Sequence, residues 1–316
     1  MFLNVISDLR IIENAPPCAV ALGMFDGVHR GHRKVIQAAI DQSDLETAVL
    51  TFTTTYQRPK KKLGQRDILT ISGRLKVLEQ LPVQTVYLPS FEQLQLFSPK
   101  RFVEDILQNT LHAKVVCCGE DFRFGRNASG DVTELKRLGA LYGIKVIVVE
   151  PELDRGQPIS STRIRSSLID GDIASVNRLL GYCYFIEGKV VYGQQLGRTI
   201  QCPTINQELD ERICIPKFGV YISTTSVDGI VYPSITNIGK KPTIAGDRQP
   251  LAETHVIGID RQMYGEILRV KLYQFIRGEE RFDSIAELSH YIQRDIQTAK
   301  NYFKCPKLNV CDKIKS

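Results

Sequence analysis

The sequence predicts an α/β domain built on a doubly wound parallel sheet, followed by an antiparallel β-barrel with a C-terminal helix. Three observations lead to this expectation. The chain has 316 residues, 43% of them hydrophobic, which is enough for two cores. Its first half alternates short apolar runs with segments of helical spacing, and its second half is rich in strand-like runs and tight turns. Because the pattern changes after Gly181, we expect domains at residues 1–181 and 182–316.

The first domain is predicted from strands and helices that alternate along the chain. The expected strands cover residues 18–25, 47–52, 83–89, 113–119 and 144–151. The expected helices cover residues 33–43, 71–81, 98–111 and 131–143, and the third of them starts at a serine with proline at its first position. Strands joined by helices in this way form parallel βαβ units, which place ligands at the carboxyl ends of the strands.

The second domain is predicted from segments with the pattern of β-strands. A loop and two short helices at residues 158–181 precede it. Strand-like segments follow at residues 182–193, 218–239, 253–258 and 266–277, and Asp228-Gly229 marks a tight turn. A helix at residues 284–303 comes last. We expect a small antiparallel barrel closed by this helix.

Charge and cysteine usage narrow the class of protein. Lys and Arg number 41 against 35 Asp and Glu, a net charge of +6 that suits anionic small molecules such as nucleotides, and we expect no nucleic-acid partner. The eight cysteines include no CxxC pair, which speaks against a zinc cluster and indicates free thiols in a reducing compartment. The chain lacks a signal-peptide pattern, and no apolar run approaches the roughly 18 residues of a membrane span. We expect a cytoplasmic protein without a membrane partner, and its oligomeric state stays open.

The stretch "GMFDGVHRGH" at residues 23–32 follows the first clear strand and leads into a helix. The first N–H groups of a helix are unpaired and its dipole is positive there, so this place favours an anion. Gly27 and Gly31 would let the backbone approach a phosphate. His29 and His32 could donate to phosphate oxygens and stabilise the charge of a leaving pyrophosphate. The alternative is that both histidines are ordinary turn residues.

Two further stretches carry candidate binding groups in the first half. In "CGEDFRFGRNASGD" at residues 118–131, Phe122 and Phe124 could stack on a flat ring or could fill the core. In "ISSTRIR" at residues 159–165, the hydroxyl groups could bind phosphate or could cap a helix. Arg165 is the stronger candidate there, because a guanidinium grips phosphate with two parallel hydrogen bonds.

The second half contains a third set of candidates. Thr204 and Asn206 stand two apart in "GQQLGRTIQCPTIN", so in an extended segment they face the same side and could bind Mg²⁺, which prefers oxygen ligands. A proline-initiated turn capped by these residues is the alternative. Glu253 begins the segment "ETHVIG", where its carboxylate could accept a proton from an attacking alcohol, with His255 on the same face. Taken alone, Glu253 would be an ordinary surface residue.

The three motifs of the first half resemble the nucleotidyltransferase module of bacterial bifunctional riboflavin kinase/FAD synthetases, whose patterns are GxFDGxHxGH, DFRFG and SSTxIR. The resemblance implies transfer of AMP from ATP to FMN, which yields FAD and pyrophosphate. The two histidines would hold the ATP phosphates, the hydroxyl groups and Arg165 would hold the triphosphate from the other side, and Asp121 would help to bind flavin or adenine. The binding residues implied in this module are Gly23, Phe25, Asp26, Gly27, His29, Gly31, His32, Asp121, Phe122, Phe124, Ser160, Ser161, Thr162 and Arg165.

The motifs of the second half resemble the riboflavin kinase module of the same family, whose patterns are GRxxGFPTAN, NIGxRPT, ExH, YG and RxExxF. The resemblance, which covers nearly the whole chain, implies phosphorylation of riboflavin to FMN with ATP. Thr204 and Asn206 would position Mg-ATP, and Glu253 would be the base for the ribityl 5′-hydroxyl. Gly197 and Arg198 would shape the phosphate loop.

The chain departs from the family pattern at two places. After the second expected strand the family carries Phe-x-Pro-His-Pro, where this chain reads "TFTTTYQRPKKK" at residues 51–62. The Gly-Phe-Pro-Thr-Ala-Asn of the kinase module reads Gln-Cys-Pro-Thr-Ile-Asn at residues 201–206. Two alternatives therefore stay open: a kinase with a degenerate adenylyltransferase half, and a non-catalytic regulator that responds to flavin.

Overall fold

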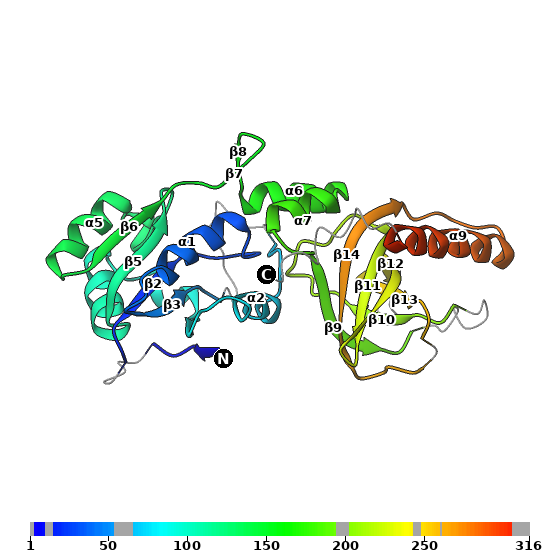
Figure 1. Ribbon diagram of the computed structural model, residues 1–316, viewed down its shortest axis with the longest axis horizontal. Helices are drawn as coiled ribbons and strands as arrows, with labels where there is room; N and C mark the ends of the chain where they lie inside the picture. Colours follow the sequence, from blue (N-terminus) through cyan, green and yellow to red (C-terminus); the bar gives the residue numbers. More distant parts are fainter. Residues whose placement is uncertain are drawn as a thin grey trace. The chain divides into compact units, whose positions relative to one another are not determined.

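The computed structural model describes residues 3–9, 15–53, 66–193, 202–242, 248–259 and 261–304 (Figure 1). The chain divides into two compact units. The first comprises Met1–Gln65 and Ile71–Ser160, and the second comprises Arg66–Thr70 and Ser161–Ser316.

The first unit is a six-stranded sheet in the order β1-β4-β3-β2-β5-β6, in which every pair of neighbours is parallel. The strands are β1 (Asn4–Ile6), β2 (Cys18–Leu22), β3 (Glu46–Leu50), β4 (Thr85–Tyr87), β5 (Ala113–Gly119) and β6 (Lys145–Val149). The helices are α1 (Arg30–Ile40), α2 (Ile71–Leu78), α3 (Phe91–Leu94), α4 (Pro99–Arg101) and α5 (Val132–Leu141). The doubly wound parallel sheet that the sequence predicts is confirmed.

The burial of β2 explains why this strand could be predicted from the sequence. All five residues of β2 are buried, and Ala19, Val20 and Ala21 have no exposed surface. A parallel strand covered on both faces has a continuous apolar sequence of this kind. The strand ends at Leu22, earlier than the expected residue 25, because the chain turns away from the sheet at Gly23.

The expected helix at residues 98–111 forms with a different hydrogen-bond pattern. The Oγ of Ser98 accepts from the backbone N–H of Arg101, which caps α4 as the Ser-Pro pair predicts. The segment then continues as a π-helix, η2 (Phe102–Thr110). The hydroxyl of Thr110 donates to the carbonyl of Asp105, 2.8 Å away and five positions earlier, which matches the wider turn.

Several short elements were not predicted, among them an edge strand and a small two-stranded sheet. The edge strand β1 has only three residues, two of them exposed, and pairs with β4. Leu153–Asp154 (β7) and Gln157–Pro158 (β8) form a separate two-stranded sheet. Segments of two or three residues are too short to show the alternation on which a strand prediction depends.

The second unit is built on a closed barrel in the order β10-β13-β12-β11-β14-β9, with antiparallel neighbours. The strands are β9 (Phe185–Val191), β10 (Ile205–Glu208), β11 (Gly219–Val227), β12 (Ile230–Pro242), β13 (Arg248–Val256) and β14 (Ile267–Arg277). The turn between β11 and β12 has φ of 50° at Asp228 and 79° at Gly229, as the Asp-Gly pair predicts. The predicted barrel is confirmed.

The C-terminal helix α9 (Ile285–Lys304) packs on the outer face of the barrel beside β11 and β12 (Figure 1). Ile296 and Ala299 of α9 share an apolar cluster with Val220, Ile222 and Ile235 of the strands. An ion pair of 2.8 Å between Arg277, at the end of β14, and the buried carboxylate of Asp295 fastens the helix. The expected closing helix is therefore confirmed.

The helices α6 (Ser161–Asp170) and α7 (Ile173–Leu180) belong to the compact unit of the barrel. The amide of Asn177 on α7 donates to the carbonyl of Leu272, 2.9 Å away on β14, and accepts from the backbone N–H of Tyr184 at 2.7 Å. The boundary between residues 181 and 182, which the sequence pattern predicts for the two functional modules, stays a prediction.

The cysteines differ in one respect from expectation. Five of them are free and buried, namely Cys18, Cys117, Cys118, Cys202 and Cys214. Cys183 is disulfide-bonded, so the expectation that all the cysteines are free thiols is wrong at this position. Spacing along a chain does not show which cysteines meet in the fold, and the scattered positions gave no sign of a pair.

Candidate active sites

Two of the predicted motifs lie at the point where the strand order of the parallel sheet reverses. The chain passes from β2 to β3 and β4 on one side, and then returns to the other side of β2 as β5 (Figure 1). Residues 23–29 follow the carboxyl end of β2, and residues 120–131 follow the carboxyl end of β5. Open α/β sheets bind their ligands in the crevice at such a reversal.

The turn after β2, residues 23–29, has a strained backbone. Gly27 has φ of 78°, which glycine adopts freely, but Phe25 and Val28 also have positive φ, at 46° and 39°. For residues with side chains this conformation costs about 1–3 kcal/mol each and persists only where the surroundings enforce it. The N–H of Val28 donates to the carbonyl of Phe25 at 3.0 Å, and the N–H of Gly23 donates to the carbonyl of Leu50 at 3.2 Å. Such strain is typical of binding sites.

The two histidines meet at the first turn of α1. His29 is the N-cap, and its Nδ1 accepts from the backbone N–H of His32 at 3.2 Å. The two histidine rings stack with centroids 3.5 Å apart, and the rings of Phe25 and His32 meet nearly at right angles with centroids 5.4 Å apart. Because Nδ1 accepts this hydrogen bond, neutral His29 carries its proton on Nε2. The cap therefore leaves Nε2 as the donor of this ring.

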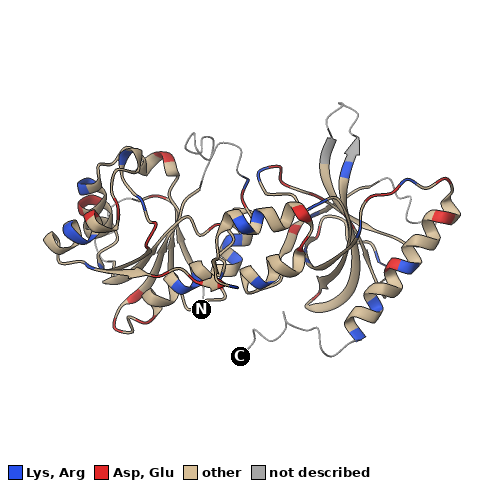
Figure 2. Ribbon diagram, turned by 90° about the horizontal axis from the view of Figure 1, so that it is seen from above, with Lys and Arg blue, Asp and Glu red and all other residues tan. Residues whose placement is uncertain are grey.

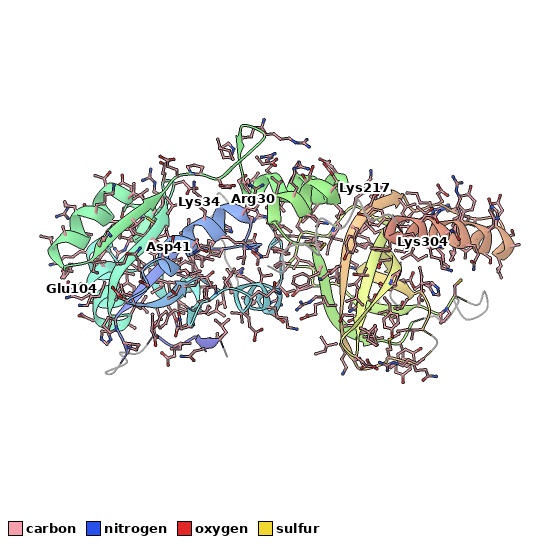
Figure 3. All side chains as sticks on the ribbon, in the orientation of Figure 1. Arg30, Lys34, Asp41, Glu104, Lys217 and Lys304 are labelled. Atoms are coloured by element: carbon pink, nitrogen blue, oxygen red, sulfur yellow. The ribbon has the colours of Figure 1, made fainter. Side chains whose placement is uncertain are left out.

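Gly31 brings a second part of the first unit close to the histidines. A Cβ at Gly31 would lie 3.3 Å from the His29 ring and 3.7 Å from the carbonyl of Ile159. Arg30, at the N-terminal end of α1 (Figure 3), forms an ion pair of 2.6 Å with Glu152. The segment that leads to Ser160 thus runs beside the start of α1.

The remaining residues of the "ISSTRIR" motif lie in the other compact unit. Ser161 is the first residue of α6, and Thr162 and Arg165 follow in its first two turns. The Nε of Arg165 donates to the carbonyl of Arg66 at 2.7 Å. That these residues and the histidines grip one triphosphate stays a prediction.

The loop after β5 divides its aromatic residues between the core and the surface. Phe124 is 6% exposed, packs against Phe102, and exchanges two backbone hydrogen bonds with Gly130. Phe122 is partly buried and stacks on Phe124 with centroids 5.8 Å apart. The ring of Phe124 therefore fills the core. Asp121 is exposed at the start of the loop, and its role in binding stays a prediction.

The two cysteines at the end of β5 are unsuited to nucleophilic chemistry. Burial raises the pKa of the Cys117 thiol to about 12 and that of Cys118 to about 11, although the nearby Lys136 opposes the shift at Cys118. Both thiols are therefore protonated at neutral pH, and only the thiolate is a strong nucleophile. Their place is in the core of the sheet.

The barrel places three polar residues side by side on neighbouring strands. Asn206 of β10 is paired with Glu253 of β13, and Glu253 is paired with Asn237 of β12. Directly opposed residues of antiparallel strands put their side chains on the same face within contact range. Asn237 was not among the predicted site residues, although it begins the "NIGKKPT" stretch, because strand register is not visible in the sequence.

The surroundings of Asn206 leave an oxygen available for a ligand. Asn206 is 5% exposed, and its buried Oδ1 has no hydrogen-bond partner within the described residues. A Cβ at Gly193 would collide with the Asn206 amide, so glycine makes room for it. No group of three His, Cys, Asp or Glu residues in the described part of the chain could hold a metal. The hard oxygens of Asn206 and Thr204 fit Mg²⁺, which needs few protein ligands when substrate phosphates supply the rest.

His255 ties the Pro203–Thr204 segment to the barrel. Its Nδ1 lies 2.9 Å from the carbonyl of Pro203. A carbonyl only accepts hydrogen bonds, so Nδ1 carries the proton of this ring. His255 is two residues from Glu253 on the same strand, and it therefore fixes Thr204 relative to the carboxylate.

Some of the predicted residues lie outside the described part of the chain. Gly197 and Arg198 are among them, as is most of the divergent stretch at residues 51–62, of which only residues 51–53 are described.

The charged residues of the described elements are mixed in sign. Lys and Arg are interspersed with Asp and Glu, as expected for a protein that binds small anions (Figure 2).

Two family models match the chain, one for each half. The model described as FAD synthetase matches residues 11–163, and the model described as riboflavin kinase matches residues 180–303. The matched ranges contain the histidine turn in the first case and the row of Asn206, Glu253 and Asn237 in the second.

Curated relatives match along nearly the whole chain. A bifunctional riboflavin kinase/FMN adenylyltransferase of Escherichia coli (strain K12) is 33% identical over 96% of this chain and 99% of its own length. A protein of the same name from Bacillus subtilis (strain 168) is 34% identical over 93% of this chain and 95% of its own.

A solved structure from Streptococcus pneumoniae, titled as a macrolide-efflux protein, is 28% identical, with a TM-score of 0.83 over 96% of this chain and 100% of its own. Within the described residues, no helix is long and apolar enough to cross a membrane.

Proposed function

The chain belongs to the family of bifunctional riboflavin kinases/FMN adenylyltransferases, and on this premise we propose how its two sites make FAD from riboflavin. The barrel unit phosphorylates riboflavin with one ATP, and the sheet unit transfers AMP from a second ATP to the resulting FMN. Both reactions depend on the positioning of phosphates and the stabilisation of charge more than on covalent chemistry.

In the kinase reaction, Glu253 is the base. One of its carboxylate oxygens accepts the proton of the ribityl 5′-hydroxyl as that oxygen bonds to the γ-phosphorus of ATP. The bond from this phosphorus to the bridging oxygen breaks, and ADP leaves with the electron pair. The register that sets Asn206 and Asn237 on either side of Glu253 is the observation that supports this assignment most directly.

The neighbours of Glu253 orient the nucleotide. The hydroxyl of Thr204 and the buried Oδ1 of Asn206 would hold Mg²⁺, which when bound would neutralise charge on the ATP phosphates. His255 keeps Thr204 in place through Pro203. Gly197 and Arg198 would complete the phosphate loop.

In the adenylyl transfer, an oxygen of the FMN phosphate attacks the α-phosphorus of ATP and pyrophosphate leaves. The attacking oxygen carries no proton at neutral pH, so the site needs donors for the leaving group and no base. His29 presents Nε2–H because its Nδ1 caps α1, and His32 stands beside it. Together with the positive end of the α1 dipole, they stabilise the charge that develops on pyrophosphate.

The other residues of this site bind the substrates. Ser160, Ser161, Thr162 and Arg165 would hold the triphosphate, and Asp121 with Phe122 would contact flavin or adenine. Gly23, Phe25, Asp26 and Gly27 shape the turn, and Asp26 is 4% exposed. We place the enzyme in the cytoplasm, where ATP is available for both steps.

Separate assays of the two half-reactions test this proposal. Purified protein is given riboflavin and ATP in one assay and FMN and ATP in the other, each with Mg²⁺ and with EDTA in its place. We expect FMN in the first and FAD in the second, both abolished by EDTA. FMN formation without FAD formation would indicate a kinase with a degenerate adenylyltransferase half. Flavin binding without turnover would indicate a regulator.

A further inference from the structure

The buried guanidinium of Arg74 is a feature that neither reaction has used. Arg74 lies in the middle of α2, is 1% exposed and is among the largest fully buried side chains of the described chain. Burial of a charged group is costly unless hydrogen bonds compensate for the lost water. An arginine at such a place therefore has a specific set of acceptors.

The acceptors of Arg74 come from the loops after two neighbouring strands. Its Nη1 lies 3.1 Å from the carbonyl of Met24, 3.1 Å from the Oγ1 of Thr51 and 3.0 Å from the carbonyl of Phe52. The hydroxyl of Thr51 donates to the same Met24 carbonyl at 2.8 Å. Met24 follows β2 and the other two follow β3, so one side chain fastens the ends of both strands.

The carbonyl that Arg74 holds belongs to the residue before the strained part of the turn. Met24 is followed directly by Phe25, the first of the residues with positive φ, and the turn ends at His29. A strained conformation persists only where its surroundings fix it. The hydrogen bonds of Arg74 and Thr51 to Met24 fix the beginning of the turn, and the cap of α1 fixes its end.

Arg74 also brings positive charge to this edge of the sheet. Its three recorded acceptors are two carbonyls and a hydroxyl, which are all neutral, so its bonds do not cancel the charge. A cation held in a region of low dielectric constant attracts anions more strongly than one in water. The phosphates of ATP and FMN are the anions of this site.

We propose that Arg74 is a positioning residue for the adenylyl transfer: it clamps the turn at residues 23–29 to the end of β3 and so sets where His29 and His32 meet the phosphates. The proposal rests on the adenylyltransferase function proposed above. Arg74 acts through the turn and need not touch the substrate. A geometric error of about 1 Å in such a site can cost roughly a hundredfold in rate.

Three variants of the full-length protein test this role. Arg74→Met removes the hydrogen bonds and the charge but keeps much of the volume, and Arg74→Lys keeps the charge and can reach only part of the acceptors. Lys76→Met is the matched control, because it removes a less buried cation from the same helix. The kcat and KM for FMN-to-FAD conversion, the riboflavin kinase rate and thermal unfolding are measured for each.

We expect Arg74→Met to lower kcat for FAD formation by roughly a hundredfold with a smaller change in the KM for ATP. Its kinase rate should match that of the wild type, which shows that the barrel unit is intact, and its thermal unfolding should show that the sheet unit is still folded. Arg74→Lys should recover part of kcat, and Lys76→Met should resemble the wild type in both reactions.

The outcomes separate the failure of this role from the failure of the function. If the wild type converts no FMN to FAD, the proposed adenylyltransferase function is wrong and the role of Arg74 falls with it. If the wild type forms FAD and Arg74→Met forms it at the same rate, the positioning role alone is wrong. Should Arg74→Met fail to fold, Arg74→Lys decides. A selective loss of FAD formation in a variant that still unfolds thermally like the wild type supports the role, and equal losses in both reactions contradict it.

Discussion

A single hydrogen bond at His29 determines which ring nitrogen is available to the substrate. Because Nδ1 accepts the N–H of His32, the proton of the neutral ring sits on Nε2. His255 shows the opposite arrangement, with Nδ1 donating to Pro203. The same residue type thus serves as a donor toward phosphate in one unit and as a structural tie in the other. Neither tautomer could be read from the sequence.

The double variant His29→Ala/His32→Ala tests the phosphate donors. Loss of one preorganised hydrogen-bond donor already lowers the rate by on the order of a hundredfold to a thousandfold. FAD formation by the double variant should therefore fall by at least about that factor. FMN formation should be unchanged. His112→Asn is the matched control, since His112 contacts the carbonyl of Ala15 and its φ of 50° suits asparagine. Unchanged FAD formation in the double variant would remove the histidines from the mechanism.

The variant Glu253→Gln tests the kinase base. The amide keeps the shape of the side chain but cannot accept the proton of the 5′-hydroxyl, so FMN formation should fall by about a hundredfold to ten-thousandfold. Conversion of added FMN to FAD should continue. Glu211→Gln serves as the control, because it removes the same negative charge from an exposed residue. Loss of both activities together in Glu253→Gln would contradict the assignment of two separate sites.

At the scale of elements, strand register and loop placement build the sites. Predicted motifs after β2 and β5 meet at the reversal of the strand order, and the barrel register sets Asn206, Glu253 and Asn237 in a row. The buried apolar sequence of β2 and the Asp-Gly turn were readable locally. The roles of Asn237 and Arg74 could not be predicted, because they depend on partners that are far away in the sequence. The edge strand β1 was not predicted, because a segment of three residues is too short to show periodicity.

The variant Asp295→Ala tests how α9 is held on the barrel. It leaves the guanidinium of Arg277, which is only 16% exposed, without its buried carboxylate partner. Breaking a buried ion pair from one side costs about 3–5 kcal/mol, so urea should unfold the variant at a clearly lower concentration. The exposed Lys300→Ala on the same helix should change stability by less than about 0.5 kcal/mol. Equal midpoints for the two variants would show that the ion pair does not anchor α9.

At the scale of the whole molecule, the phosphate donors proposed for one reaction and the base proposed for the other lie in different compact units, each with its own core. The sheet unit carries the histidine turn and the barrel unit carries Glu253. The two-part fold was predictable because each half has a distinct pattern of apolar residues. The packing of α6 and α7 with the barrel was not predictable, because the spacing of apolar residues in a helix does not show which neighbour the helix contacts. The disulfide at Cys183 was not predictable either, because spacing along the chain does not show which cysteines meet in the fold.

Separate sites predict that two damaged proteins can complement each other. An equimolar mixture of Glu253→Gln and His29→Ala/His32→Ala should form FAD from riboflavin, since FMN released by the second protein is a substrate for the first. Each variant alone should form far less FAD from riboflavin than the mixture does. The flavins are separated by chromatography after a fixed time. A mixture that accumulates FMN without FAD would contradict the two separate sites, because the Glu253→Gln protein should convert that FMN.

The most direct test of the two-step account is the time course of flavins that the purified wild-type protein forms from riboflavin, ATP and Mg²⁺. The account predicts that FMN appears first and that FAD follows as FMN is consumed. This result would also show that the chain tolerates its departure from the Phe-x-Pro-His-Pro pattern. FMN that accumulates without any FAD would contradict the adenylyltransferase half of the account, and unchanged riboflavin would contradict both halves.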